Sequence, residues 1–129
     1  MGHPDERHIY MACTTSPVMV QCLTCDKFND FTQPCLWNSA SFSHDGTHYV
    51  WTCTGSYTEP LITVINTKTK ETMMTWENNA KLNTELRGKA APLQRDFWVD
   101  VDGGFKAQVR LILPHDFDEA KKYPLLIYT

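Results

Sequence analysis

The 129-residue sequence has no long apolar run and no stretch rich in lysine or arginine. No window approaches the roughly 18 apolar residues of a membrane-spanning helix, and residues 1–6 lack the basic and apolar regions of a signal peptide. Twelve basic against fifteen acidic residues give a formal net charge of −3, with no basic run to follow a phosphate backbone. We therefore expect no membrane span within these residues and no nucleic-acid partner, and any targeting segment would lie in sequence outside them.

The sequence also lacks the Gly-x-Ser-x-Gly elbow that presents a catalytic serine at a strand-to-helix turn. Its serines fall in predicted strands and loops, and no downstream aspartate and histidine pair accompanies any of them: Ser16, Ser39, Ser41, Ser43 and Ser56. We expect no catalytic residue in this chain.

Residues 8–66 show short alternating apolar runs separated by turn residues, which is typical of a β-sandwich, barrel or propeller. The clearest unit is a hairpin over residues 39–54, where Asp45-Gly46 supplies positive φ angles and Tyr49, Trp51 and Cys53 alternate on the return strand. Further strands are expected at residues 8–12, 18–23 and 61–65, with a polar turn at 66–70. The tryptophans are interpreted as core or blade-to-blade packing: Trp37, Trp51, Trp76 and Trp98.

The pattern changes near residue 72, where we place a domain boundary. Residues 80–90 predict a short helix with Leu82 and Leu86 on one face, and residues 95–102 and 106–113 predict two strands joined through Asp102-Gly103-Gly104. Asp116 is expected to cap a helical turn over residues 117–122. Residues 125–127 form an apolar run typical of a strand covered on both faces. That strand needs neighbouring strands that this chain does not supply. We therefore expect these residues to be the first part of an incomplete domain.

The five cysteines allow three interpretations. A zinc site would use Cys22 and Cys25 with two further ligands, but Cys35 and Cys53 form no second Cys-x-x-Cys pair. A thioredoxin-type motif needs a helix after its first cysteine, and residues 27–33 predict none. Disulfides are the third interpretation. Cys13 is expected to be a small buried hydrophobe.

Other polar residues suggest no metal or cofactor site. The histidines are interpreted as solvent-exposed loop residues, because no acidic ligand spacing accompanies them: His3, His8, His44, His48 and His115. Asp100 with Asp102 is interpreted as a solvated hairpin flank, and Asp116 with Asp118 as a helix cap, because neither pair continues into a calcium loop.

Two sets of motifs resemble the dipeptidyl peptidase IV family of prolyl-oligopeptidase-type serine peptidases. One runs from Leu113-Pro114 through Phe117-Asp118 to Lys121-Lys122-Tyr123-Pro124-Leu125-Leu126. The other comprises Cys22-Leu23-Thr24-Cys25, Cys35, Ser41-Phe42-Ser43 with Asp45-Gly46, and Cys53-Thr54-Gly55. The similarity extends over about residues 7–129.

The resemblance implies a mainly β fold, with residues 1–71 ending a β-propeller and residues 72–129 beginning a truncated α/β-hydrolase domain. It also implies the disulfides Cys22–Cys25 and Cys35–Cys53 and hence an extracellular setting, in a secreted protein or the ectodomain of a single-pass membrane protein. Full-length relatives remove dipeptides after proline or alanine and act as homodimers, and their catalytic residues follow the matching stretch.

The resemblance therefore predicts an architectural segment that is inactive alone and, with open strand edges, marginally folded or prone to aggregate. The main alternative is a piece of a catalytically inactive ectodomain with a binding or channel-associated role. An independent disulfide-rich binding module is a third possibility, which requires that the 129 residues fold alone.

Overall fold

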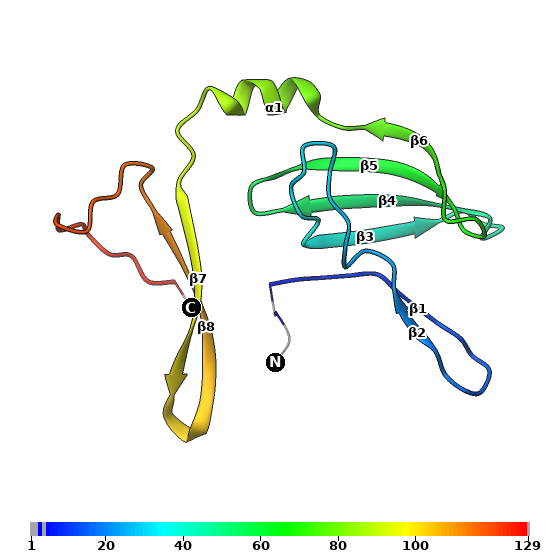
Figure 1. The fold of residues 1–129 in the computed structure, drawn as a ribbon, viewed down its shortest axis with the longest axis horizontal. Coiled ribbons are helices and arrows are strands. Elements are labelled where there is room, and N and C mark those ends of the chain that lie inside the picture. Colours follow the sequence, from blue (N-terminus) through cyan, green and yellow to red (C-terminus); the bar gives the residue numbers. More distant parts are fainter. Residues whose placement is uncertain (1–2, 4, 129) are drawn as a thin grey trace. The chain divides into compact units, whose positions relative to one another are not determined.

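The computed structural model describes residue 3 and residues 5–128, and these residues are mainly β (Figure 1). They form two compact units, Met1–Glu85 and Leu86–Thr129. The strands pair antiparallel in three separate sheets. The mainly β fold expected from the sequence is confirmed.

The first unit is built on a four-stranded antiparallel meander of β3 (Trp37–Phe42), β4 (His48–Gly55), β5 (Thr58–Asn66) and β6 (Thr72–Glu77), in that order. Alternate residues of β4 and β5 are buried, as the period of a half-buried strand requires. Their buried residues lie directly opposite one another, in the pairs Tyr49 with Ile65, Trp51 with Thr63, and Cys53 with Leu61. One face of the sheet therefore holds the core. Burial on this face raises the pKa of the Tyr49 phenol.

Polar side chains form hydrogen bonds within the first and third turns of this meander, between β3 and β4 and between β5 and β6. In the loop between β3 and β4, only Gly46 takes a positive φ, of 68°, while Asp45 instead accepts hydrogen bonds from Ser43 and Thr47. Between β5 and β6, the Asn66 side chain accepts from two backbone N–H groups of residues 68 and 69. Both turns lie where the sequence predicts them.

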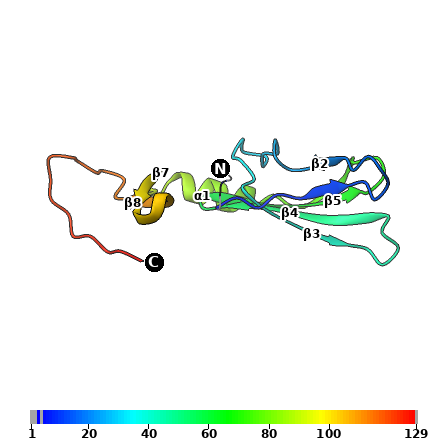
Figure 2. The same ribbon diagram turned by 90° about the horizontal axis from the view of Figure 1, so that it is seen from below.

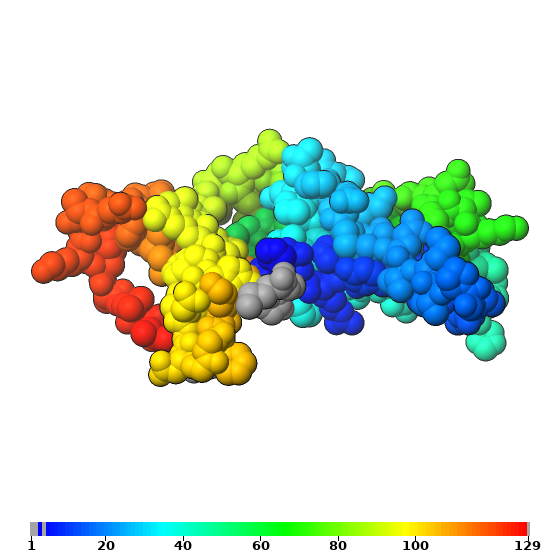
Figure 3. Space-filling model, turned by 60° about the horizontal axis from the view of Figure 1, so that its bottom comes forward, coloured from blue at the N-terminus to red at the C-terminus, as the bar shows by residue number. Residues whose placement is uncertain are grey.

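The core face is covered by the chain's own N-terminal segment. β1 (Tyr10–Ala12) pairs with β2 (Val20–Cys22), and Ile9 packs against the core cluster. Figure 2 shows this hairpin beside the sheet, seen from below. In the space-filling view, the blue and cyan residues lie in front of the sheet and hide most of it (Figure 3). Asn29 Nδ2, from the segment that follows the hairpin, donates to the Glu59 carbonyl of β5.

A buried amide joins these layers. Asn38 is only 1% exposed, and its Oδ1 accepts a 2.9 Å hydrogen bond from the Trp51 indole. Its Nδ2 donates to the Cys35 carbonyl at 2.6 Å and to the Arg7 carbonyl at 3.0 Å. In β3 the buried side chain is thus Asn38, whereas Phe42, four residues further along the strand, is exposed and its ring lies against Tyr49.

The helix α1 (Ala80–Arg87) is held to the sheet by polar contacts. Asn83 is its buried residue and donates to Glu59 Oε1 at 2.9 Å. The second carboxylate oxygen of Glu59 is buried and accepts no hydrogen bond from the part of the chain that the structure describes. Leu82 and Leu86, which the sequence placed on a common face, are both partly exposed.

The compact units divide at Glu85 and Leu86, and β6, which follows the expected domain boundary near residue 72, hydrogen-bonds to β5 in the first sheet. The boundary itself stays a prediction. The assignment of the two parts to particular domains stays a prediction.

The second unit contains one long hairpin of β7 (Leu93–Val101) and β8 (Phe105–Leu113), joined through η1 (Asp102–Gly104). Gly103 and Gly104 adopt φ angles of 80° and 76°, which a residue with a Cβ rarely takes, so the predicted glycine turn is present. Across the strands, Arg110 Nε donates to Asp96 Oδ1 at 2.8 Å and lowers the pKa of that carboxyl.

The C-terminal residues differ from the prediction in two ways. Asp118, not Asp116, accepts the local backbone hydrogen bond, from Ala120 N, and residues 117–122 form turns without a helix. Leu125, Leu126 and Ile127 are 74%, 93% and 75% exposed and form no strand. The second difference arises because no described strand pairs with this run or covers it.

We expect Asn38→Ala to lower the free energy of unfolding by roughly 3 kcal/mol, because two buried groups, the Trp51 N–H and the Cys35 carbonyl, lose their partners. Urea unfolding followed by tryptophan fluorescence measures the change. Ser41→Ala, at an exposed position of the same strand, is the control and should have little effect. Equal midpoints for the two variants would contradict the assigned role of Asn38.

The hydrogen bonds from Ser43 and Thr47 lower the pKa of Asp45 from 3.8 to about 2. A carboxyl whose pKa is lower in the folded state stabilises the fold above its unfolded pKa. This contribution is complete above about pH 4 and declines as the pH falls from 3.8 toward 2. An NMR titration of the Asp45 carboxyl should show the low pKa, and Ser43→Ala should return it toward 3.8. A wild-type value of 3.8 would rule out these bonds in solution.

Candidate functional site

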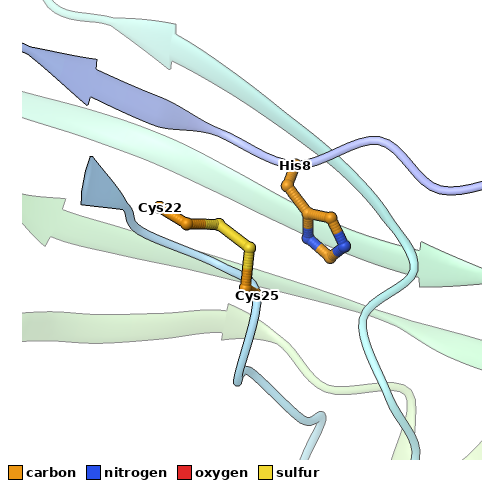
Figure 4. Close-up of side chains that lie close together, drawn as sticks. All are labelled: His8, Cys22 and Cys25. Atoms are coloured by element: carbon orange, nitrogen blue, oxygen red, sulfur yellow. A yellow bond between two sulfur atoms is a disulfide. The ribbon is translucent and has the colours of Figure 1, made fainter. Parts of the chain in front are cut away.

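The most concentrated group of chemically reactive side chains lies where β2 leaves the β1–β2 hairpin. One ligand atom each of His8, Cys22 and Cys25 lies within 4.8 Å of the others, and the imidazole ring faces the two sulfurs (Figure 4). Cys22 and Cys25 are joined as a disulfide across a four-residue loop. His8 lies just before β1 and reaches this loop from the neighbouring chain segment.

Thr24, inside the loop, fixes the histidine and the disulfide relative to each other. Its buried hydroxyl accepts a 3.0 Å hydrogen bond from Ile9 N and contacts His8 Nδ1 at 3.3 Å. On the other side of the ring, His8 Nε2 lies 3.3 Å from Glu6 Oε2. The ring is therefore oriented by a carboxylate at one nitrogen and by the disulfide loop at the other.

As a disulfide, this group cannot bind zinc, because metal binding requires free thiolates. The zinc interpretation of the sequence considered Cys22 and Cys25 but did not find His8. The sequence contains no spacing that connects His8 to the cysteines, since the contact depends on the pairing of β1 with β2.

The second disulfide, Cys35–Cys53, is part of the core. Its residues are 1% and 0% exposed, and it connects the segment before β3 to the inward face of β4. Closing an 18-residue separation in the unfolded chain contributes roughly 3 kcal/mol to stability. Both disulfides implied by the family resemblance are thus present in the structure.

The remaining cysteine, Cys13, is exposed rather than buried, so that prediction was wrong. It follows β1 at the tip of the β1–β2 hairpin, where no core exists to cover it. Its Sγ lies 2.9 Å from Thr15 Oγ1, and hydrogen bonds from Thr15 lower the pKa of the thiol.

A serine, an aspartate and a histidine come together in the loop between β3 and β4, but they do not form a catalytic triad. Ser43 Oγ donates to Asp45 Oδ1 at 2.6 Å, so the acid contacts the serine directly. The His48 ring is bonded to Thr47 Oγ1 at 2.7 Å instead of to Ser43. A triad requires the imidazole between serine and acid, and these contacts serve to close the turn.

The other candidate residues divide between the surface and the interior. Asp100 pairs with Lys106 at 2.9 Å across the β7–β8 hairpin, as a solvated flank would. His8 is largely buried, which corrects its assignment as an exposed loop residue, because Thr24 and Glu6 bind both of its nitrogens. Of the tryptophans only Trp51 is in the core, whereas Trp37, Trp76 and Trp98 are exposed by 49%, 67% and 39%.

Within residue 3 and residues 5–128, no helix is long and apolar enough to cross a membrane.

The exposures of the two disulfides predict the order in which they are reduced. Cys25 is exposed, whereas Cys35 and Cys53 are buried, so a brief treatment with dithiothreitol should open Cys22–Cys25 first. Alkylation followed by mass spectrometry identifies the freed thiols, and Cys13 should be alkylated without reductant. Simultaneous opening of both disulfides would contradict the burial of Cys35 and Cys53.

Comparisons with known proteins agree with this architecture. Residues 1–60 match the family described as dipeptidyl peptidase IV N-terminal region. The chain is 35% identical over 126 residues to venom dipeptidyl peptidase 4 of Vespa velutina, covering 98% of this chain and 16% of that protein. It is 33% identical to the prolyl endopeptidase FAP of Mus musculus and 32% identical to dipeptidyl peptidase 4 of Bos taurus, with the same shares covered.

The chain thus spans about one sixth of the length of these relatives. The stretch that matches the family model, residues 1–60, contains both disulfides and the strands β1 to β4. The chain is thus similar to dipeptidyl peptidases over 98% of its length, and residues 1–60 match the model of the dipeptidyl peptidase IV N-terminal region.

Proposed function

We propose that this chain is a structural segment of a dipeptidyl-peptidase-like serine peptidase. In this proposal the first unit, through β6, forms the end of a β-propeller, and the second unit begins an α/β-hydrolase domain. The segment supports proteolysis by the whole protein, which removes N-terminal Xaa-Pro or Xaa-Ala dipeptides, and holds none of the catalytic residues itself.

The main support is the similarity of almost the whole chain to proteins named as peptidases, at 98% coverage. The β3–β6 meander supports the propeller assignment, because a propeller blade is a four-stranded antiparallel sheet. One face of this sheet is covered by the chain itself, while half-exposed Val50, Ile62 and Val64 point to the other. A neighbouring blade would bury that second face.

The setting we propose is extracellular. Two disulfides in a chain of this size fit an oxidising compartment, and one relative is named a venom protein. Whether the parent protein is secreted or anchored stays open in this proposal, and homodimerisation remains a prediction from the family resemblance.

The test compares the product of the complete transcript with residues 1–129. We expect the complete product to hydrolyse Gly-Pro-p-nitroanilide and residues 1–129 alone to show no turnover. In the complete protein, the double variant Cys35→Ser, Cys53→Ser should lower the yield of folded protein without changing kcat per titrated active site, because the disulfide acts on stability. Cys13→Ser, at an exposed position, is the matched control and should change neither quantity.

Turnover by residues 1–129 alone would overturn the architectural role. A folded complete protein without turnover would instead support the inactive ectodomain. A lower kcat per active site in the disulfide variant would show that this segment takes part in the reaction more directly.

A further inference from the structure

We propose that reduction of Cys22–Cys25 creates a zinc site whose protein ligands are the two thiolates and the His8 imidazole. Water would complete a four-coordinate ion, as in known Cys₂His zinc sites with three protein ligands. This inference does not depend on the peptidase assignment, because it concerns only the contacts around the β1–β2 hairpin.

The distances already approach those of a metal site. Zinc binds sulfur at about 2.3 Å and imidazole nitrogen at about 2.0–2.1 Å, so tetrahedral ligand atoms lie about 3.5 Å apart. The ligand atoms of His8, Cys22 and Cys25 lie within 4.8 Å of one another while the disulfide is intact. Opening the bond lets the sulfurs separate, and shifts of about 1 Å suffice to complete the geometry.

The histidine is oriented as a zinc ligand needs to be. The Glu6 carboxylate at 3.3 Å accepts the proton of Nε2, which leaves the lone pair of Nδ1 free to bind a metal. Histidine ligands of zinc commonly donate their other N–H to a carboxylate in this way. Nδ1 is also the nitrogen that contacts the Cys22–Cys25 loop, through Thr24 Oγ1.

Moving Nδ1 from its present partners to a metal leaves no buried group without a hydrogen bond. Asn38 Nδ2 approaches Nδ1 at 3.4 Å, but its two N–H groups are already used by the carbonyls of Cys35 and Arg7 at 2.6 and 3.0 Å. Thr24 Oγ1 loses the bond that its O–H donates to Nδ1 but keeps the one that it accepts from Ile9 N. The surrounding structure can therefore stay in place when the site forms.

The redox step balances with a dithiol reductant. Two electrons and two protons pass from the dithiol, whose own sulfurs join, and the Cys22–Cys25 bond is replaced by two thiols. Zinc binding then releases these two protons to solvent, and the two thiolates neutralise the charge of Zn²⁺. Affinity consequently rises with pH.

The second disulfide offers no comparable site. Cys35 and Cys53 are buried in the apolar core, and the described residues place no group of three metal-binding side chains around them. Selective reduction of the exposed loop is therefore sufficient to form the proposed site.

The experiment uses the full 129-residue chain carrying Cys13→Ser, which removes the unrelated thiol. The chain is reduced with dithiothreitol, desalted under argon and titrated with Co²⁺, and the Co²⁺ is then displaced by Zn²⁺. We expect one equivalent to bind the reduced chain, with tetrahedral ligand-field bands and a thiolate-to-cobalt charge-transfer band, and none to bind the oxidised chain. Mass spectrometry after alkylation verifies that Cys35–Cys53 remains closed.

Variants separate the proposed site from a simple pair of thiols. The milder Glu6→Gln, which alters only the orientation of the ring, should weaken binding by about tenfold. His8→Asn, which removes a ligand, should weaken binding more than Glu6→Gln does. His44→Asn, at an exposed position outside the cluster, is the matched control and should bind like the parent.

Failure of the reduced chain to bind Co²⁺, or a spectrum without the thiolate band, would overturn the proposal. So would equal affinities for the His8→Asn and His44→Asn variants, which would mean that an unfolded Cys-x-x-Cys segment binds the metal by itself. None of these results bears on peptidase activity, so the outcomes for the two proposals are independent.

Discussion

The first unit depends on one buried polar group, the side-chain amide of Asn38. Among the described residues, six buried apolar residues form the core of this sheet. An amide left unpaired in such a small core would lower the free energy of unfolding by a large fraction of the unit's stability. Its partners come from β4, from the segment before β3 and from the segment before β1. Because one side chain bonds to all three, the amide couples the position of the N-terminal segment to that of the sheet. That arrangement also positions His8 against the Cys22–Cys25 loop.

The parts of the fold that follow from local rules could be predicted from the sequence. The alternation of Tyr49, Trp51 and Cys53 and the turns at Gly46 and Gly103 each depend on residues close in sequence, and the structure contains all of them. The contacts that depend on long-range pairing could not be predicted. Asn38, Glu59 and Asn83 are polar residues that a hydrophobic pattern assigns to the surface, yet all three are buried. Asn38 bonds to Trp51, and Asn83 bonds to Glu59, so these contacts join residues that are distant in sequence. The exposure of Cys13 and the burial of His8 also depend on long-range pairing, that of β1 with β2.

In the candidate site, too, some features could be predicted from the sequence and others depended on long-range contacts. The family resemblance implied both disulfides, but no spacing in the sequence associates His8 with Cys22 and Cys25. The absence of a catalytic elbow could be established from the sequence. That the Ser43, Asp45 and His48 cluster closes a turn could be decided only from which atoms bond to which. A combination of residue types becomes a site only when the geometry connects the right atoms.

The strand order β3-β4-β5-β6 has a consequence for how the protein is made. Each strand pairs with the one synthesised immediately before it, so the sheet contains no long-range crossover and its loops close at low entropic cost. During translation, domains fold from the N-terminus as the chain leaves the ribosome. The sheet can therefore form, and Cys35 can pair with Cys53, before the second unit has emerged. The residues synthesised later would then fold next to a sheet that is already held together by the Cys35–Cys53 disulfide.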